Sequence, residues 1–244
     1  MIKKQGLLMR VGIDQTYGQF NAPINPISLD YFYLPIPQDN HKFIAGMKTS
    51  YDNDTLHFNA WCQKNETSLR FPAHLTGRDC HLDPDFEHLS YGDQATGRGL
   101  RVAELKRGDI IAFFASFKPI HECEHKLIYA IFGVIVVDQV RKVSETKSTD
   151  YYKNAHTRIV NMNQDHLIVS GNPEQSGRFA HAIPIGEFRN GSYRVTKSVL
   201  DEWGGLEVKD GFIQRSVCPP RFTDINRFYE WLQSKNLKII NSNY

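Results

Sequence analysis

Two dense apolar runs near the middle of the chain constrain the fold more than any other feature. Ile110 to Phe114 follows a turn at Arg107-Gly108-Asp109, and Leu127 to Val137 is a longer run rich in β-branched and aromatic residues. The polar segment 118–126 separates them, which predicts two strands joined by a loop. Strands this apolar are typical of a sheet that is buried on both faces or closed into a barrel.

Shorter strands and a few helices are predicted around this pair. We expect strands at Leu7–Ile13, Tyr31–Ile36, His166–Ser170, Ala182–Glu187 and Phe212–Ser216, and helices at Thr55–Gln63, Thr196–Trp203 and Asp224–Lys235. The 244 residues contain no internal repeat, so we expect a single domain over residues 1–244. The mixture predicts an α+β fold around a curved, mostly antiparallel sheet, open or barrel-like, with flanking helices.

The segment His81–Asp93 concentrates ionisable side chains. It holds four acids, two imidazoles and a phenol in thirteen residues. Groups this close push each other's pKa values apart, which lets one site hold an acid and a base at neutral pH. A helix capped by Asp83 and running to about Ser90 would place Asp85 and His88 on one face. The alternative is that the acids only cap and stabilise this helix while the histidines are solvated.

A second candidate carboxylate lies where the first strand gives way to a glycine loop. Asp14 occurs in the run Gly12-Ile13-Asp14-Gln15-Thr16-Tyr17-Gly18. Strand ends favour functional groups because the strand holds the backbone still while the side chain faces a cleft. Asn21 offers an amide that can read a base edge or a sugar, and Tyr17 offers a ring for stacking. The alternative is an Asx turn at Asp14 with Tyr17 in the core.

Polar turns in the second half of the chain combine cations with aromatic rings. They are Asn154–Arg158, Gln175–Arg178, Trp203–Gly205 and Lys209–Arg215. Such combinations suit phosphate groups and flipped or single-stranded bases, although ordinary cores and surfaces contain them as well. The formal net charge is only +2, so any contact with nucleic acid needs a local basic face.

Cysteines and familiar motifs exclude several classes of protein. Cys62, Cys80, Cys123 and Cys218 form no C-x-x-C pair, which is typical of a reducing cytoplasm. The loop from His121 to His125 offers two histidines and Cys123 but no evident fourth ligand, so we expect no metal. No P-loop, dinucleotide fingerprint or G-x-S-x-G motif occurs, and we expect no cofactor. We also expect no signal peptide and no membrane span, hence a cytoplasmic protein.

Several motifs in a fixed order resemble a known family over nearly the whole chain. They are Arg10–Asp14 with Thr16–Gly18 and Asn21–Pro23, then His81–His88, Gly108–Ile111, Asn154–His156, and finally Trp203–Gly205 with Asp210–Arg215. This set is similar to the third class of nucleotide-modification-associated domains, prokaryotic and phage-linked proteins tied to modified DNA. The resemblance implies an anti-phage DNA glycosylase that excises glucosylated hydroxymethylcytosine and leaves an abasic site. Residues 39–70 and the His121 loop fall outside the resemblance.

The leading hypothesis is therefore a glycosylase acting on double-stranded DNA that carries a bulky modified cytosine. Breaking an N-glycosidic bond builds positive charge on the sugar, which a carboxylate stabilises once the base has left the helix. We expect Asp85 or Asp14 to be that carboxylate, and the two to face one flipped nucleotide. The candidate residues are Asp85, Asp14, His81, Glu87 and His88 for catalysis, Tyr17, Asn21, Tyr91, Asp93 and His156 for the substrate, and Arg158, Arg178, Trp203, Lys209, Gln214 and Arg215 for DNA.

Two other functions remain open at this point. In a non-catalytic reader of modified bases, the acids would accept hydrogen bonds from the modification and the aromatic rings would enclose the base. In an enzyme that makes or transfers a nucleotide modification, free nucleotides would be the substrates. We expect neither a membrane nor an obligate protein partner in any of the three.

Overall fold

The two apolar runs form the antiparallel pair at the centre of the molecule. The structure is a computed structural model and describes residues 4–38, 41–214 and 218–244. β6 (Ile110–Pro119) and β7 (Ile128–Lys142) pair from Ile110 opposite Val136 to Phe117 opposite Ile128. Most of their side chains are buried on both faces, which accounts for their unbroken apolar composition.

Six further strands extend this pair into one sheet. β1 (Gly6–Arg10) and β2 (Pro23–Ile24) run parallel to β6, whereas β8 (Leu167–Gly171) and β9 (Gly177–Pro184) run antiparallel to β7. β5 (Ser90–Asp93) pairs with β8, and β12 (Ile239–Ile240) pairs with β9. The main path runs β1-β6-β7-β8-β5, so within the described residues the sheet is open rather than a closed barrel. The predicted α+β fold with a mostly antiparallel sheet is confirmed.

Helices and short strands surround the sheet. The α-helices are α1 (Tyr51–Lys64), α2 (Leu100–Ala103), α3 (Lys197–Trp203) and α4 (Ile225–Ser234). The remaining strands are β3 (Ile36–Pro37), β4 (Cys80–His81), β10 (Gly186–Arg189) and β11 (Ser192–Val195), and the 3-10 helices are η1 (Ala73–Leu75), η2 (Gly97–Gly99), η3 (Val143–Glu145), η4 (Ser148–Lys153) and η5 (Lys209–Gly211). No helix in the described part of the chain is long and apolar enough to cross a membrane.

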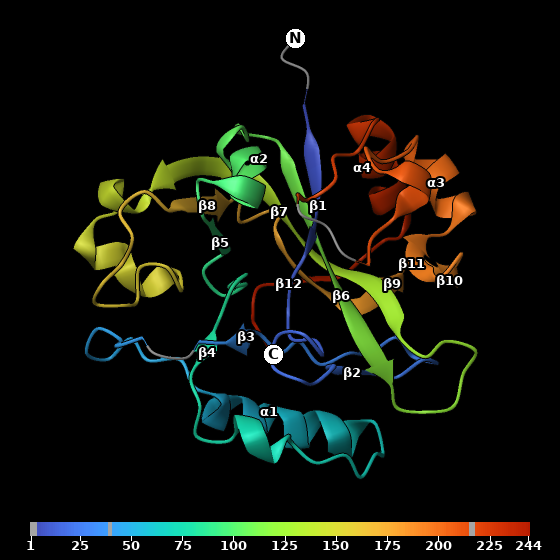
Figure 1. Cartoon of the computed structure of the whole chain (residues 1–244), viewed down its shortest axis with the longest axis horizontal. Helices are drawn as coiled ribbons and strands as arrows, with labels where there is room; N and C mark the ends of the chain where they lie inside the picture. Colours follow the sequence, from blue (N-terminus) through green and yellow to red (C-terminus); the bar gives the residue numbers. More distant parts are fainter. Residues whose placement is uncertain (1–3, 39–40, 215–217) are drawn as a thin grey trace.

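Each face of the sheet carries its own core, because successive side chains along a strand point to opposite faces. On one side, called the first face here, Met9 and Phe113 belong to a core that includes α1 and Phe86. On the other side, the second face, Leu8 and Phe114 belong to a core that includes α3 and α4. Figure 1 shows α3 and α4 together at the right of the sheet and α1 below it.

The three predicted helices are confirmed, and their caps follow the sequence. α3 begins after Thr196, whose hydroxyl accepts the Val199 N–H, and ends at Gly204 in the left-handed conformation with φ 73°. α4 begins after Asp224, whose carboxylate accepts two backbone N–H groups. α1 starts four residues before the predicted Thr55, because Ser50 supplies the cap by accepting the Asp52 N–H.

Two predicted strands do not form as expected. Tyr31 makes only an isolated bridge to Ile24, and the strand predicted at Tyr31–Ile36 is otherwise replaced by a buried irregular segment and β3. Pro35 and Pro37 have no N–H to donate to a ladder, which limits regular pairing to the two residues of β3. Phe212 likewise makes an isolated bridge, to Arg194, and residues 215–216 lie outside the described residues.

One further strand and one helix also differ from prediction. The strand predicted at Ala182–Glu187 is divided at Ile185, because β9 ends at Pro184 and β10 begins at Gly186. The helix predicted from Asp83 to about Ser90 is wrong. Residues 84–89 form a tight loop closed by two hydrogen bonds of 2.9 Å between the backbones of Asp85 and Ser90.

Candidate functional site

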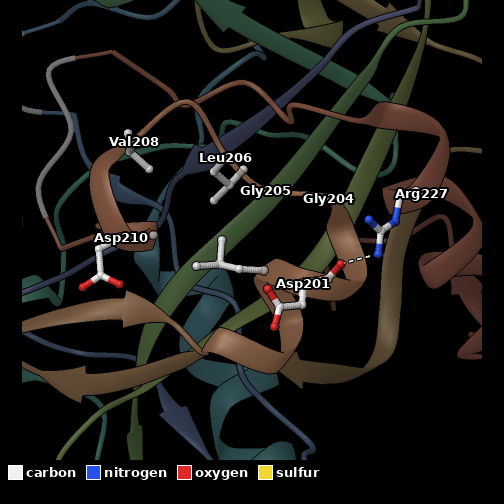
Figure 2. Close-up of a pocket in the computed structure, with 9 residues that line it drawn as sticks. Asp201, Gly204, Gly205, Leu206, Val208, Asp210 and Arg227 are labelled. Atoms are coloured by element: carbon white, nitrogen blue, oxygen red, sulfur yellow. Dashed lines mark hydrogen bonds between the residues drawn. The ribbon is translucent and has the colours of Figure 1, made fainter.

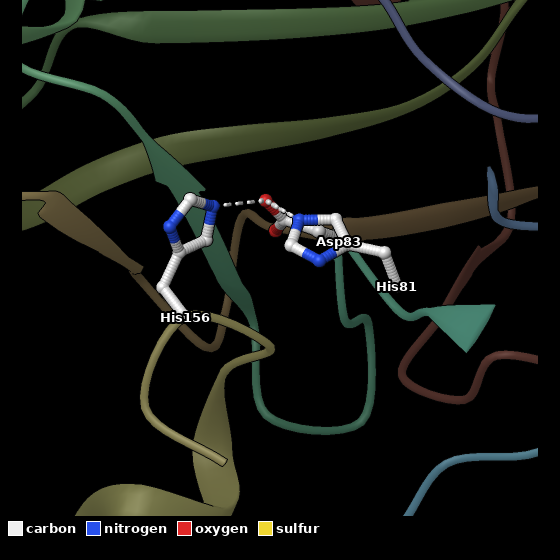
Figure 3. Close-up of side chains that lie close together, drawn as sticks. All are labelled: His81, Asp83 and His156. Atoms are coloured by element: carbon white, nitrogen blue, oxygen red, sulfur yellow. Dashed lines mark ion pairs between the residues drawn. The ribbon is translucent and has the colours of Figure 1, made fainter. Parts of the chain in front are cut away.

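Asp83 organises a buried polar cluster on the first face. Its two carboxyl oxygens each lie 3.0 Å from the Gly92 backbone N, which donates to them, and Asn154 Nδ2 donates to Oδ1 at 3.4 Å. These donors occupy the carboxyl group that was expected to cap a helix. Figure 3 shows the imidazoles of His81 and His156 turned towards Oδ2, from which their Nε2 atoms lie 3.8 and 3.7 Å away. We call His81, Asp83 and His156 the histidine cluster.

Burial favours the neutral forms of all three members of the histidine cluster. It raises the pKa of the Asp83 carboxyl well above its usual range, an effect that the Gly92 and Asn154 hydrogen bonds only partly offset. It lowers the pKa of His81 to about 4 and takes the pKa of His156 well below its ordinary value, and electrostatic interactions with neighbouring basic side chains add to both shifts. Both imidazoles are therefore uncharged at neutral pH and present lone pairs.

The backbone of Gly92 lies close against the ring of His156. A Cβ atom added at Gly92 would lie 2.2 Å from His156 Cδ2 and 2.7 Å from Asn154 Oδ1. A glycine inside a strand often marks such an approach of another segment, and here it lets the loop after η4 reach β5. His156 Nδ1 lies 2.7 Å from His166 Nδ1, so one of these two nitrogens donates to the other. The ring of His156 is thus held between Gly92 and His166.

Asp85 is enclosed next to this cluster. Its carboxylate accepts hydrogen bonds from Arg158 Nη2 at 2.5 Å and Asn243 Nδ2 at 3.0 Å, and His88 Nδ1 lies 2.9 Å from it. Burial raises the pKa of Asp85, but the hydrogen bond from His88 and the charge of Arg158 outweigh it, and the net shift is downward. Asp85 and its side chain are 0% exposed. Asp85 therefore cannot meet a substrate in this conformation. Its hydrogen bonds position the loop 84–89 instead, and this positioning role replaces the catalytic role that we expected for it.

Asp14 forms the predicted alternative, an Asx turn. Its Oδ1 accepts the backbone N–H groups of Thr16 at 2.7 Å and Tyr17 at 2.8 Å, and its Oδ2 pairs with Arg10 Nη2 at 2.8 Å. Tyr17, however, is 62% exposed and not part of the core. A carboxylate and an exposed aromatic ring therefore lie together at the end of β1.

Amide and hydroxyl groups complete the surroundings of Asp14. Arg10 also donates to Ser116 Oγ at 3.2 Å, and Asn21 Nδ2 donates to the Ser116 carbonyl at 2.9 Å. Gln15 Nε2 donates to Asn21 Oδ1 at 3.1 Å. We call Arg10, Asp14, Gln15, Asn21 and Ser116 the Asp14 cluster. It draws on the ends of the parallel strands β1 and β6, which fix its position.

Arg10, the partner of Asp14, and Phe86, the chain neighbour of Asp85, pack against different cores of the sheet. The Arg10 guanidinium sits 5.4 Å from the Tyr129 ring, which belongs to the second-face core. Phe86, next to Asp85, packs against Phe113 in the first-face core. The expectation that Asp14 and Asp85 face one nucleotide stays a prediction.

The other predicted site residues divide between exposed, buried and undescribed positions. Glu87 and Lys209 are exposed, whereas Tyr91 and Asp93 are buried and joined by a hydrogen bond of 2.7 Å from the Tyr91 hydroxyl. Arg215 lies outside the described residues.

Four of the expected DNA contacts already have internal roles. Arg158 is buried against Asp85, and Arg178 Nε donates to the Ser242 carbonyl at 2.7 Å. Gln214 Oε1 accepts the Tyr193 N–H at 2.9 Å. Trp203 is 0% exposed, so the expectation that its ring stacks on a base is wrong. It packs at the core between α3 and α4, against Phe222, Phe228 and Trp231.

A cavity of about 560 Å³ opens on the second face beside α3 and α4. Figure 2 shows Gly204, Gly205 and Asp210 around it, so it joins two motifs that were expected to contact DNA. Trp203 does not line it. Arg227 enters the lining with a hydrogen bond to the Asp201 carbonyl. Its volume is in the range of small-ligand pockets, about 300–1,000 Å³.

The His121 loop offers its possible metal ligands at the surface. His121, Cys123 and His125 are all exposed. Among the described residues, the side chains with the spacing of metal ligands are those of the histidine cluster, whose ligand atoms lie within 4.8 Å of one another. Sequence reasoning treated Asp83 as a cap and His156 as a substrate contact. Nothing local links two residues that are 73 positions apart (156 − 83).

Other partners in these networks were also missed. His166 was read only as the start of a strand, and Asn243 and Ser116 were not considered at all. Asn243 bonds to Asp85 across 158 positions, and Asn21 bonds to Ser116 across 95. Such side chains carry no pattern of their own, so the signals for this region were the ionisable segment 81–93 and the Asn154–His156 motif.

One comparison with known proteins identifies the family. No curated protein and no solved structure matches the chain. The family model described as nucleotide modification associated domain 3 matches residues 5–210, which include the histidine cluster, the Asp14 cluster and most of the sheet. The chain therefore belongs to the nucleotide modification associated domain 3 family.

Proposed function

We propose that this protein is a DNA glycosylase that excises glucosylated hydroxymethylcytosine from phage DNA, with Asp14 as the carboxylate beside the sugar. Membership of a family associated with nucleotide modification supports a modified nucleotide as the substrate. The proposed action is anti-phage, because removing such a base leaves an abasic site in the invading genome. Asp14 takes the role that sequence reasoning shared between Asp14 and Asp85.

The state of the Asp14 carboxylate is the observation that carries this proposal. An ionised carboxylate offers about four lone-pair sites. Thr16, Tyr17 and Arg10 fill three of them, and the side chain remains 13% exposed. One acceptor site is thus left for a substrate or a water. The carboxylate is also held rigidly by its three donors, as electrostatic stabilisation of a reacting centre requires.

The chemistry needs little beyond this group. Water adds to C1′ of the deoxyribose while the C1′–N1 bond breaks, and the electron pair leaves with the base, which takes up a proton. Asp14 stabilises the positive charge that develops on the sugar and orients the water. Tyr17, 62% exposed beside it, offers a face to the base or its sugar once the nucleotide has left the helix.

A strand-cleavage assay tests the proposal. Duplexes carrying cytosine, hydroxymethylcytosine or glucosylated hydroxymethylcytosine are incubated with the protein and treated with alkali, which breaks DNA at abasic sites. We expect breaks only with the glucosylated duplex. Asp14→Asn should abolish them and spare DNA binding, while Asp138→Asn, an exposed carboxyl on β7, serves as the matched control and should keep full activity.

Other outcomes would assign a different function. Binding that depends on the modification, without breaks from the wild-type protein, would replace the glycosylase with a reader of modified bases. Activity confined to free nucleotides would point to an enzyme that makes or transfers the modification. Full cleavage by Asp14→Asn would refute Asp14 as the essential carboxylate.

A further inference from the structure

We propose that His81, Asp83 and His156 bind a divalent transition-metal ion through His81 Nε2, Asp83 Oδ2 and His156 Nε2. This inference is independent of the proposed glycosylase activity, since the histidine cluster and the Asp14 cluster are separate. It also departs from the sequence-based expectation, which was that the chain binds no metal.

The distances in the histidine cluster are those of ligands around one ion rather than of hydrogen-bonded groups. The two Nε2 atoms lie 3.8 and 3.7 Å from Asp83 Oδ2, beyond the reach of a hydrogen bond. Bonds of about 2.0–2.2 Å from zinc to nitrogen or oxygen place two ligands of a tetrahedral ion about 3.4 Å apart. Shifts of a few tenths of an ångström therefore bring each imidazole to this distance from Asp83, and the two imidazole nitrogens, within 4.8 Å of each other, close onto the same ion.

The surroundings orient each ligand as metal sites require. The Gly92 N–H donates to both carboxyl oxygens of Asp83 and the Asn154 side-chain amide donates to Oδ1, while Oδ2 faces the two imidazoles. His166 meets His156 through Nδ1 atoms 2.7 Å apart. When His156 Nδ1 donates in this contact, its Nε2 carries the lone pair that a metal needs.

Access and ligand type narrow the class of metal. The His81 side chain is 21% exposed and the His156 side chain 11%, so one side of the cluster communicates with solvent. Two imidazoles and one carboxylate suit zinc, iron(II), cobalt(II) and manganese(II) better than calcium or magnesium, which prefer oxygen ligands. Three protein ligands leave positions for water or substrate, as in sites where the metal takes part in chemistry.

Metal binding to the full chain tests this site directly. The protein is stripped with a chelator, titrated with Co²⁺ and dialysed, and bound cobalt is measured by elemental analysis and by its visible absorption bands. A parallel titration with Zn²⁺ follows the midpoint of thermal unfolding. We expect one ion per chain, cobalt bands of a site with nitrogen and oxygen ligands, and a rise in the unfolding temperature.

Variants locate the bound ion. His81→Ala and His156→Ala should lose it, and His166→Ala, which removes only an orienting partner, should weaken binding about 10–100-fold. His121→Ala removes an exposed histidine and is the matched control, with unchanged binding expected. Circular dichroism verifies that each variant is folded.

Three results would overturn the inference. The folded wild-type protein could fail to retain stoichiometric Co²⁺ or Zn²⁺. Folded His81→Ala could retain the ion, or His121→Ala could lose it. The wild-type titration decides the matter even if His156→Ala does not fold. Because no readout involves DNA, the metal site and the glycosylase proposal can fail separately.

Discussion

The buried carboxyl of Asp54 makes the stability of this fold depend on pH. Asp54 lies in the first turn of α1 and is 3% exposed. Burial raises its pKa from 3.8 to about 6, although hydrogen bonds from Tyr244 and Cys80 act in the other direction. The folded chain therefore holds a proton at pH 5 that the unfolded chain has released.

The size and sign of the effect follow from linkage. A difference of about 2 pKa units corresponds to about 3 kcal/mol, at about 1.4 kcal/mol per unit. Because the folded pKa is the higher one, this stability is fully present below about pH 4 and is lost as pH rises through about 6. At pH 7 the charged carboxylate makes folding about 3 kcal/mol less favourable than at pH 4, other groups being equal.

Urea unfolding of Asp54→Asn and the wild-type protein between pH 4 and pH 7 tests this reasoning. Asparagine is neutral throughout and still accepts the Tyr244 hydroxyl, so the variant should gain about 3 kcal/mol relative to wild type across this range. Taking the difference cancels the titration of all other groups. Tyr244→Phe removes a bond that favours the charged form and should make the pH dependence steeper. A difference between Asp54→Asn and wild type that stays constant with pH would refute the buried, neutral carboxyl.

Three further predictions concern buried contacts. Arg158→Ala leaves the Asp85 carboxylate without its guanidinium partner and should lower the free energy of unfolding in urea by about 3–5 kcal/mol; a loss under 1 kcal/mol would mean that water reaches Asp85. Trp203→Ala should cost about 3–5 kcal/mol in the same assay and Trp203→Phe clearly less, because the ring fills a core; equal losses would contradict this. Gly133→Ala places a Cβ 2.6 Å from the Phe86 ring and should cost about 1–3 kcal/mol, seen as a lower thermal midpoint.

Sequence reasoning succeeded where the signal is local. The β6–β7 pair, α3 and α4 were predicted because the apolar runs of the strands, the Gly204–Gly205 stop of α3 and the apolar stripe of α4 are all local signals. Their boundaries moved by a few residues only. The same reasoning overestimated the strand at 31–36, where residues 31–35 are buried without a ladder and regular pairing is limited to β3.

The polar networks could not be predicted in the same way. Asp83 before Pro84 carries the local signal of a helix start, yet its carboxyl group bonds to Gly92 and Asn154 instead. A partner supplied by a distant loop outweighed the local preference, because a buried carboxyl without hydrogen bonds costs several kcal/mol. The density of acids in segment 81–93 was a correct sign of an unusual environment, but their roles depended on residues far away in the chain.

Three aspartates of this chain show what the sequence leaves undecided. Asp85 is closed off by Arg158 and Asn243, so its carboxylate is bound by groups within the protein. Asp83 is also buried but faces two neutral imidazoles at distances that fit a shared ion. Asp14 has the most exposed side chain of the three, at 13%, and keeps an acceptor site for a substrate. Enclosure and the nature of the neighbours therefore separate a positioning group, a proposed metal ligand and a proposed catalytic carboxylate.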